Sequence, residues 1–214
     1  MGQNDEVESF LNQRFPDAKC ALDFSNPFQC LVAVVLSAQT NDQAVNRVTP
    51  ALFSSYPDPF ALAKAEPEEI EKIIKTLGIY HHKAKNLIDL ANSLVNQFDN
   101  GVPLRKEDLL SLPGVGNKTA NVVLAETVSR PAIAVDTHVE RVAKRLGYVK
   151  KNDDPSTVEE ELEKQFPKAH WIKLHHQFIA FGRALCRAKK PLCGGCGLRS
   201  HCLYFKKNSS TTAK

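Results

Sequence analysis

Residues 105–136 constrain the fold of this chain more than any other stretch, because a glycine-rich turn there separates two helical patterns. The turn reads Leu-Pro-Gly-Val-Gly over residues 112–116. Proline fixes one backbone torsion and disfavours a helix, while glycine accepts positive φ at little cost. The apolar spacing predicts a short helix over residues 105–111 and a second over 117–127. We therefore expect two helices joined by a tight hairpin.

The hairpin leaves the first amides of the second helix without partners inside that helix. Together with the positive end of the helix dipole, these N–H groups form a ready anion site. Binding by the backbone suits a nucleic-acid phosphate, because it reads no base. Gly114, Val115 and Gly116 are therefore candidate DNA contacts. The alternative is a tight turn in which the glycines serve geometry alone.

Two ionisable residues stand at helix starts. Lys118 lies in the first turn after the hairpin, where the dipole disfavours a positive charge and favours the neutral, nucleophilic amine. Its alternative role is that of a solvated, phosphate-binding lysine. Asp136 precedes a helical pattern in which Thr137 and Glu140 have capping-box spacing, so we expect that helix not to need Asp136 as its cap. Asp136 would then be available for chemistry, although a plain helix cap is the alternative.

Four of the six cysteines lie close together near the C-terminus, in the pattern Cys-x6-Cys-x2-Cys-x5-Cys. In a reducing compartment such crowding favours a metal over disulfides. Four thiolates suit either zinc or an iron–sulfur cluster. Structural zinc sites normally use two close pairs, and only one pair is close here, but the residues alone leave the metal open. The candidate ligands are Cys186, Cys193, Cys196 and Cys202.

Three cations, Arg187, Lys189 and Lys190, lie between the first two of these cysteines. A loop fixed by a metal and carrying three cations would form a rigid electropositive knob. We expect it to dock on nucleic-acid phosphates with salt-sensitive affinity. The alternative is ordinary solvated charge beside a structural metal site.

Composition supports a globular nucleic-acid-binding protein without requiring one. The chain has 214 residues, is 43% hydrophobic and carries a net charge of +4, which fits one large or two small domains. Helical patterns dominate, and we expect an all-α fold without a sheet. No secretory signal or long apolar run is present, so we expect no membrane association and a cytoplasmic location, on the nucleoid in a bacterium. We expect a monomer.

The blocks LPGVGNKTANVVL (residues 112–124) and VDTHVERV (residues 135–142) resemble the endonuclease III family of DNA glycosylase/AP lyases. That family belongs to the helix-hairpin-helix base-excision superfamily, and the resemblance covers essentially residues 5–205. It implies that Lys118 is the nucleophile and that Asp136 assists it. It also implies that the four cysteines hold a [4Fe–4S] cluster. Because the sequence shows no obvious flavin site or second redox site, we expect the cluster to have a structural role. Asn117 departs from the basic residue often found in the family, which puts one phosphate contact in doubt.

A third family block, LSAQTND, spans residues 36–42. The resemblance makes Gln39 a wedge that fills the gap left by an extruded base. It makes Ile79 a second wedge, inserted between base steps as apolar side chains of other proteins are. The alternatives are that Gln39 lies in an ordinary loop after a buried helix, and that Ile79 packs under its own loop.

The resemblance further implies two helical domains with a DNA cleft between them, presenting Lys118 and Asp136 from opposite walls. Residues 21–131 would form a helical-barrel domain that ends in the helix-hairpin-helix motif. Residues 1–20 with 132–207 would form the cluster domain, and residues 208–214 a disordered tail.

The implied function is the removal of oxidised or damaged pyrimidines from duplex DNA. The strand would then be cut 3′ to the abasic site by β-elimination through a lysine Schiff base. The expected partner is double-stranded DNA containing damaged bases or abasic sites.

Two rival functions differ from this one in the residues that they require. Adenine-removing glycosylases of the same superfamily lack a lysine at the position of Lys118 and carry a further C-terminal domain. A noncatalytic hairpin module with a structural metal would need neither Lys118 nor Asp136. Strand nicking at an abasic site distinguishes that module from the enzyme.

Overall fold

The structure, a computed structural model of the chain, describes residues 2–209. Over these residues it contains twelve α-helices and two short 3-10 helices, and no strand. The predicted all-α fold is confirmed. None of the helices in this described part combines the length and the apolar character that a membrane crossing requires. The chain divides into two compact units, Ala21–Arg130 (the first unit) and Met1–Cys20 with Pro131–Lys214 (the second unit).

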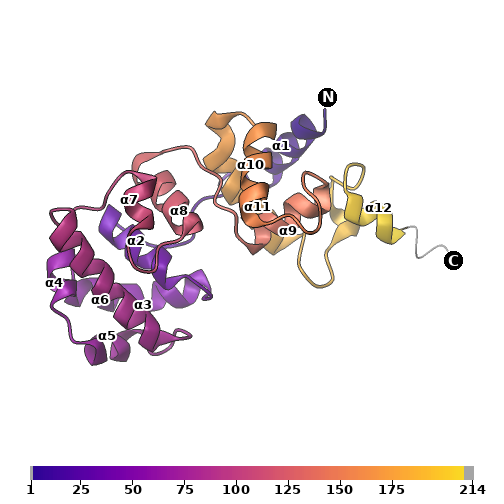
Figure 1. The fold of residues 1–214 in the computed structure, drawn as a ribbon. Coiled ribbons are helices and arrows are strands. Elements are labelled where there is room, and N and C mark those ends of the chain that lie inside the picture. Colours follow the sequence, from indigo (N-terminus) through magenta and orange to yellow (C-terminus); the bar gives the residue numbers. More distant parts are fainter. Residues whose placement is uncertain (1, 210–214) are drawn as a thin grey trace. The chain divides into compact units, whose positions relative to one another are not determined.

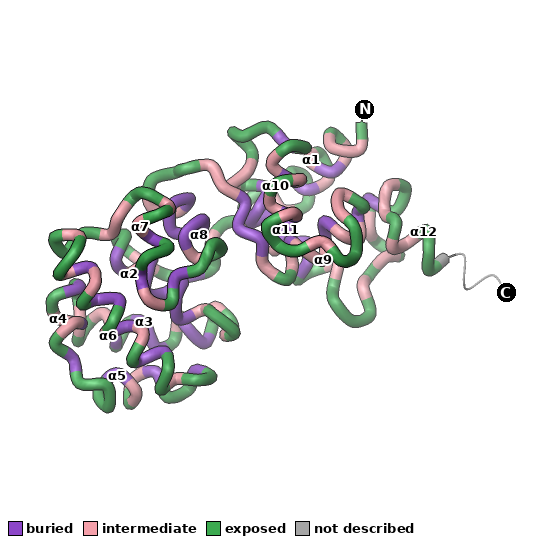
Figure 2. Tube along the Cα trace, viewed as in Figure 1, coloured by how far each residue is buried: buried purple, intermediate pink, exposed green. Residues whose placement is uncertain are grey.

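The first unit is built around α2, whose sequence PFQCLVAVVL is apolar on every side. Asn26 caps the helix by accepting a hydrogen bond from the Gln29 amide at 2.9 Å, and Pro27 occupies the first helical position. Eight of the ten residues of α2 are buried, which makes it the central helix of this unit (Figure 2). The helix packs against α8, and α6 packs against α4 and α5.

The helices of the first unit follow in chain order (Figure 1): α2 Pro27–Leu36, α3 Asp42–Ser55, α4 Pro59–Ala63, α5 Pro67–Ile74, α6 Tyr80–Gln97, α7 Lys106–Leu110 and α8 Asn117–Val128. The predicted pair over residues 105–111 and 117–127 corresponds to α7 and α8, so the helix–hairpin–helix arrangement is confirmed. Each helix end differs from the prediction by one residue at most.

The second unit packs α11 against α9 and α1. Aliphatic side chains make up most of its core, and three phenylalanines pack among them; Phe166 and Phe178 meet edge to face with ring centroids 6.3 Å apart. Three of the clustered cysteines pack against this core, so the cysteine loop is part of the folded unit. Its helices are α1 Gln3–Arg14, α9 Thr137–Leu146, α10 Pro155–Gln165, η1 Lys168–His170, α11 Trp171–Ala184, η2 Cys193–Gly195 and α12 Leu203–Ser209.

The start of the predicted disordered tail is wrong. Asn208 and Ser209 form the end of α12, and the rest of the tail, residues 210–214, lies outside the described residues. Two contacts explain the longer helix: the Asn208 side chain donates to the Tyr204 carbonyl at 2.7 Å, and the Tyr204 ring stacks on Arg145 at 4.2 Å. The Ser/Thr-rich composition of residues 208–214 predicted disorder, but it gives no information on Tyr204, which precedes this segment and anchors α12.

Gly147 provides a test of how α9 ends. Its φ of +90° is left-handed, and an added Cβ would lie 2.6 Å from Leu203 Cδ1. We expect Gly147→Ala to lower the free energy of unfolding by about 1–2 kcal/mol, measured by urea denaturation, because an L side chain is strained there. The control is Gly78→Ala, where an added Cβ meets no atom within 4 Å. We expect that change to stay within about 0.5 kcal/mol. Equal losses in the two variants would contradict the explanation.

Candidate functional site

The hairpin over residues 112–116 is held by two buried apolar side chains, Leu112 and Val115. The Val115 amide donates to the Leu112 carbonyl at 3.1 Å, which closes the turn. Gly114 has a left-handed φ of +78°, and an added Cβ would lie 3.5 Å from both Val35 and Asn86. The hairpin therefore packs on α2 and α6 and requires glycine for its backbone conformation.

The other side of the hairpin is open at Gly116, which precedes the first residue of α8. No side chain caps α8, and an added Cβ at Gly116 meets no atom within 4 Å among the described residues. The first amides of α8 have no partner within the helix, so they remain available to an anion. Gly114 and Gly116 are exposed, whereas Val115 is buried and offers only its backbone.

Lys118 is the second residue of α8 and is exposed. The first turn of α8 contains no acidic residue, and no ion pair with Lys118 is found within residues 2–209. An accessible amine therefore stands at the same helix start as the uncapped amides. Such an amine can attack an electrophilic carbon that is bound beside them.

Asp136 is the N-cap of α9, so the expectation that the helix would not need it is wrong. Its Oδ1 atom accepts hydrogen bonds from the amides of His138 and Val139, both at 2.8 Å. Thr137 is the first helical residue and lies one position too late to act as the cap of a capping box.

Capping occupies only one oxygen of the carboxylate. No hydrogen bond to Oδ2 of Asp136 is found in the described part of the chain. The side chain is half-buried. Asp136 thus combines the role of a cap with an oxygen available for chemistry. It belongs to the second unit, and Lys118 to the first.

Gln39 and Ile79 are both exposed and both have left-handed backbones, with φ of +55° and +50°. Ile79 is 55% exposed, so the alternative that it packs under its loop is wrong. It is the only β-branched residue among the non-glycine residues with positive φ in the described chain. A β-branched residue is an outlier in that region, and such strain gathers at functional sites.

All four clustered cysteines line one cavity in the second unit, together with apolar side chains that include Phe181 and Leu185. Within the described residues, however, no group of three or more metal-binding side chains is arranged to hold a single ion. The cavity is the more informative observation, because the thiols of a four-iron cluster need not converge on one point: each binds its own iron. The cysteine set is compatible with such a cluster.

The environment of the thiols also fits cluster ligands. Burial raises the pKa of the Cys186 and Cys196 thiols, which on its own disfavours the thiolate form. N–H donors, however, lie beside three of the four sulfurs, and one of them is the Leu198 amide beside Cys196. Arg145 Nη1 donates to Cys186 Sγ at 3.3 Å, and the Phe205 amide donates to Cys202 Sγ at 3.4 Å. Hydrogen bonds of this kind stabilise the negative charge of bound thiolates.

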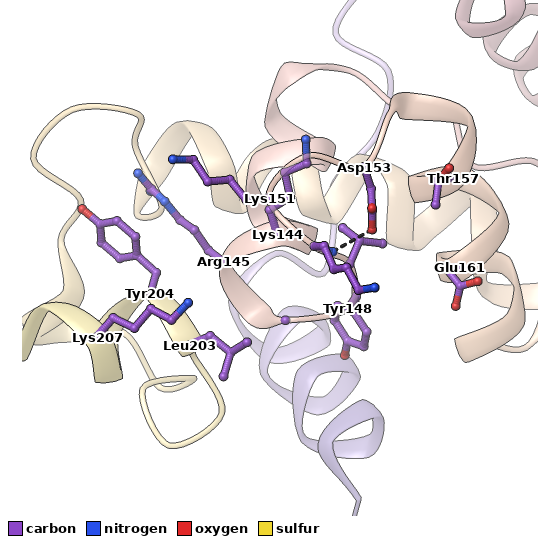
Figure 3. A pocket seen from close by; sticks show the side chains of 13 residues that line it. Lys144, Arg145, Tyr148, Lys151, Asp153, Thr157, Glu161, Leu203, Tyr204 and Lys207 are labelled. Carbon is purple, nitrogen blue, oxygen red and sulfur yellow. Dashed lines mark hydrogen bonds between the residues drawn. The ribbon is translucent and has the colours of Figure 1, made fainter.

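The three cations between Cys186 and Cys193 are exposed, which both the predicted docking knob and the alternative of ordinary solvated charge require: Arg187, Lys189 and Lys190. The structure adds a second cationic surface, a groove between α9, α10 and α12 (Figure 3). Asp153 and Glu161 are its acidic residues, and Lys144 is paired with Glu140 at 2.5 Å. The cationic residues that line it are Lys144, Arg145, Lys150, Lys151 and Lys207.

Comparison with known proteins identifies the family. The family model described as HhH-GPD superfamily base excision DNA repair protein matches residues 32–168. Endonuclease III of Synechocystis sp. is 47% identical over 198 residues, which cover 92% of this chain and 90% of the relative. Endonuclease III of Bacillus subtilis is 46% identical, with 90% and 88% covered. The chain belongs to the endonuclease III family.

A solved structure supports the same assignment at the level of the fold. A trapped endonuclease III–DNA covalent intermediate superposes with a TM-score of 0.92 at 43% identity, and the match covers 98% of this chain and 100% of that one. Endonuclease III enzymes are DNA glycosylases with AP lyase activity. This endonuclease III family member is therefore a DNA-binding enzyme of base excision repair.

Lys83, a buried lysine in the first turn of α6, is not among the residues predicted from the sequence of this family member. Its Nζ donates to Thr40 Oγ1, next to Gln39. A signal was present in the sequence, because Lys83 shares the helical spacing of the buried residues Leu87, Leu90 and Leu94. A lysine on an apolar stripe is unusual, since lysine is almost never fully buried without a partner.

Asp136 allows capping and chemistry to be separated in this family member. We expect Asp136→Ala to lower the free energy of unfolding by about 1 kcal/mol, because α9 loses its cap. Asn caps helices about as well as Asp, so Asp136→Asn should stay within about 0.5 kcal/mol of the unchanged chain. Urea denaturation measures both changes. A loss as large in Asp136→Asn as in Asp136→Ala would show that capping is not what the carboxylate contributes to stability.

Proposed function

We propose that this enzyme removes oxidised or ring-damaged pyrimidines from duplex DNA and cuts the strand 3′ to the abasic site by β-elimination. The observation that carries the proposal is the start of α8, where uncapped amides and the exposed amine of Lys118 occupy one helix end. The amides suit a phosphate of the damaged strand, and the amine suits attack on its sugar.

The DNA must be opened before any chemistry, because the bond between base and sugar is inaccessible inside the stack. We assign the phosphate contact to the amides around Gly114, Val115 and Gly116. Gln39 fills the space left by the extruded base, and Ile79 inserts at a neighbouring base step. The exposure and the left-handed backbones of both wedges support this assignment.

Lys118 acts as the nucleophile. Its neutral Nζ bonds to C1′ of the deoxyribose while the C1′–N bond breaks and the base leaves with the electron pair and gains a proton. The amine then loses a proton, the sugar ring opens, and a protonated Schiff base forms between Nζ and C1′. We assign to Asp136 the task of balancing the positive charge that develops on the sugar.

The Schiff base prepares the strand for cleavage. The iminium draws electrons from C2′, so a base can remove a C2′ proton there. The C3′–O bond then breaks, and the 3′ phosphate leaves with the electron pair. Water hydrolyses the remaining imine, which releases the aldehyde product and restores Lys118.

Cys186, Cys193, Cys196 and Cys202 are proposed to hold a [4Fe–4S] cluster. When bound, the cluster supplies a covalent cross-link of the loop over residues 186–202. In the cross-linked loop, Arg187, Lys189 and Lys190 form a fixed cationic surface that contacts the DNA backbone. We further propose that the enzyme is a monomer acting in the cytoplasm on the DNA of the bacterial nucleoid.

Borohydride trapping tests the nucleophile. With a duplex containing an abasic site, the unchanged enzyme should form a covalent complex and Lys118→Ala none, because the imine cannot form. Asp136→Asn should bind the damaged duplex while excision slows roughly 100-fold or more. Lys72→Ala removes an exposed lysine from α5 and should trap normally. Trapping by Lys118→Ala would disprove the assignment of the nucleophile.

Iron and acid-labile sulfide analysis tests the cluster. We expect Cys202→Ser to lose both, because serine does not replace a thiolate ligand well. Its affinity for undamaged duplex should fall, with a weaker dependence on salt, since the cationic loop is no longer fixed. The control is Cys20→Ser, which lies outside the cavity and should keep its iron. Zinc without iron or sulfide in the unchanged enzyme would contradict the proposed cluster.

A further inference from the structure

Lys83 connects the two turns that carry Gln39 and Ile79. Its amide donates to the Ile79 carbonyl at 3.2 Å, and its Nζ donates to Thr40 Oγ1. Thr40 directly follows Gln39, and its own amide donates to the Ser37 carbonyl at 3.0 Å. Lys83 therefore links the two turns: its backbone contacts the turn before α6, and its side chain contacts the turn between α2 and α3.

The energetics of Lys83 are unfavourable for a purely structural residue. Its side chain is buried, with 4% of the residue exposed, and burial lowers its pKa. No carboxylate pairs with it among residues 2–209. An apolar side chain of the same length would avoid the cost of burying a charge. Burial of the amine therefore destabilises the folded protein, and the hydrogen bond to Thr40 offsets only part of this cost.

The hydrogen-bond directions at Thr40 allow its hydroxyl to accept a hydrogen bond from Lys83. The Thr40 hydroxyl can donate to the Ala38 carbonyl, which lies 3.4 Å from Oγ1. Its lone pairs then face the donor on Lys83. The second contact of the Ile79 turn is weaker: His81 Nδ1 lies 2.7 Å from Glu71 Oε2, but the His81 side chain is 65% exposed. Exposed pairs contribute little, and this one leads to α5, away from Gln39.

We infer that Lys83 is a positioning residue that fixes the turns of Gln39 and Ile79 relative to each other, so that both side chains enter damaged DNA as one rigid probe. The inference rests on the proposed function of Gln39 and Ile79 as wedges. A wedge on a free turn would lose conformational entropy on insertion, whereas a fixed turn has lost it on folding. Burying Lys83 therefore lowers the stability of the free enzyme, but it also lowers the entropy that the wedges lose when they insert into DNA.

A double-mutant cycle tests whether Lys83 couples the two wedges. The measurement is the Kd for a duplex containing a tetrahydrofuran abasic-site analogue, read by fluorescence anisotropy. In the unchanged enzyme, the losses caused by Gln39→Ala and Ile79→Ala should be non-additive, because one rigid probe is disrupted by either change. In the Lys83→Met background the same two losses should become additive. Lys83→Met alone should weaken binding roughly three- to tenfold.

Two matched variants separate this effect from loss of charge and from misfolding. Thr40→Val removes the acceptor from the other end of the hydrogen bond and should reproduce the additivity. Lys85→Met removes an exposed lysine two residues further along α6 and should leave both Kd and coupling unchanged. The thermal midpoint of Lys83→Met should equal or exceed that of the unchanged enzyme. A loss of affinity that follows a fall in that midpoint would show a merely structural lysine and overturn the inference.

The remaining outcomes also decide the question. Non-additivity that persists in Lys83→Met, or an equal loss in Lys83→Met and Lys85→Met, would overturn the inference while leaving the wedges in place. If Gln39→Ala and Ile79→Ala each bind the analogue normally, the wedge assignment fails and the inference fails with it. Borohydride trapping through Lys118 would be unaffected by that result, so the failure of the wedges is distinguishable from failure of the proposed chemistry.

Discussion

The unpaired amides at the start of α8 are the feature on which the rest of the site depends. A residue with a capping side chain before α8 would bind those amides itself, and an anion could reach them only by displacing it. Gly116 has no side chain, and Gly114 allows the chain to turn tightly enough to leave the helix end exposed. Lys118 can then share that helix end with a bound phosphate, which offsets the unfavourable interaction of its charge with the dipole.

The first amides of α9 also lack partners within their helix, but there a side chain of the protein pairs with them. There Asp136 provides its own carboxylate oxygen to the first amides, so no external anion is needed. The two hydrogen bonds to Oδ1 also fix the rotation of the carboxyl group and therefore the direction of Oδ2. Capping and catalysis are usually discussed as alternatives for such a residue, but here the cap orients the group for the chemistry proposed for it.

Local rules predicted the parts of the fold that depend on neighbours in sequence. The hairpin and α8 follow from proline, glycine and apolar spacing, and the limits of α8 agree with the prediction to within one residue. Asp136 was harder to interpret, because which residue caps α9 depends on backbone torsions that sequence does not state. The link from Lys83 to Thr40 joins positions 43 residues apart, and nothing in local sequence reports such a contact. The pairing of Lys118 with Asp136 follows from family resemblance, because the two residues belong to different units and no local pattern links them.

Several features that destabilise the folded protein lie on or beside two turns of the first unit. Gln39 and Ile79 have backbones that favour glycine, Ile79 exposes an apolar side chain to water, and Lys83 buries a charge without a carboxylate. Each departure destabilises the free protein, and a folded chain retains such features where the surroundings hold them and function requires them. Because Lys83 holds both turns, these costs are connected: relieving the buried charge would also release the strained residues. The contact that makes this region less stable than it could be is therefore the one that keeps its exposed side chains in place.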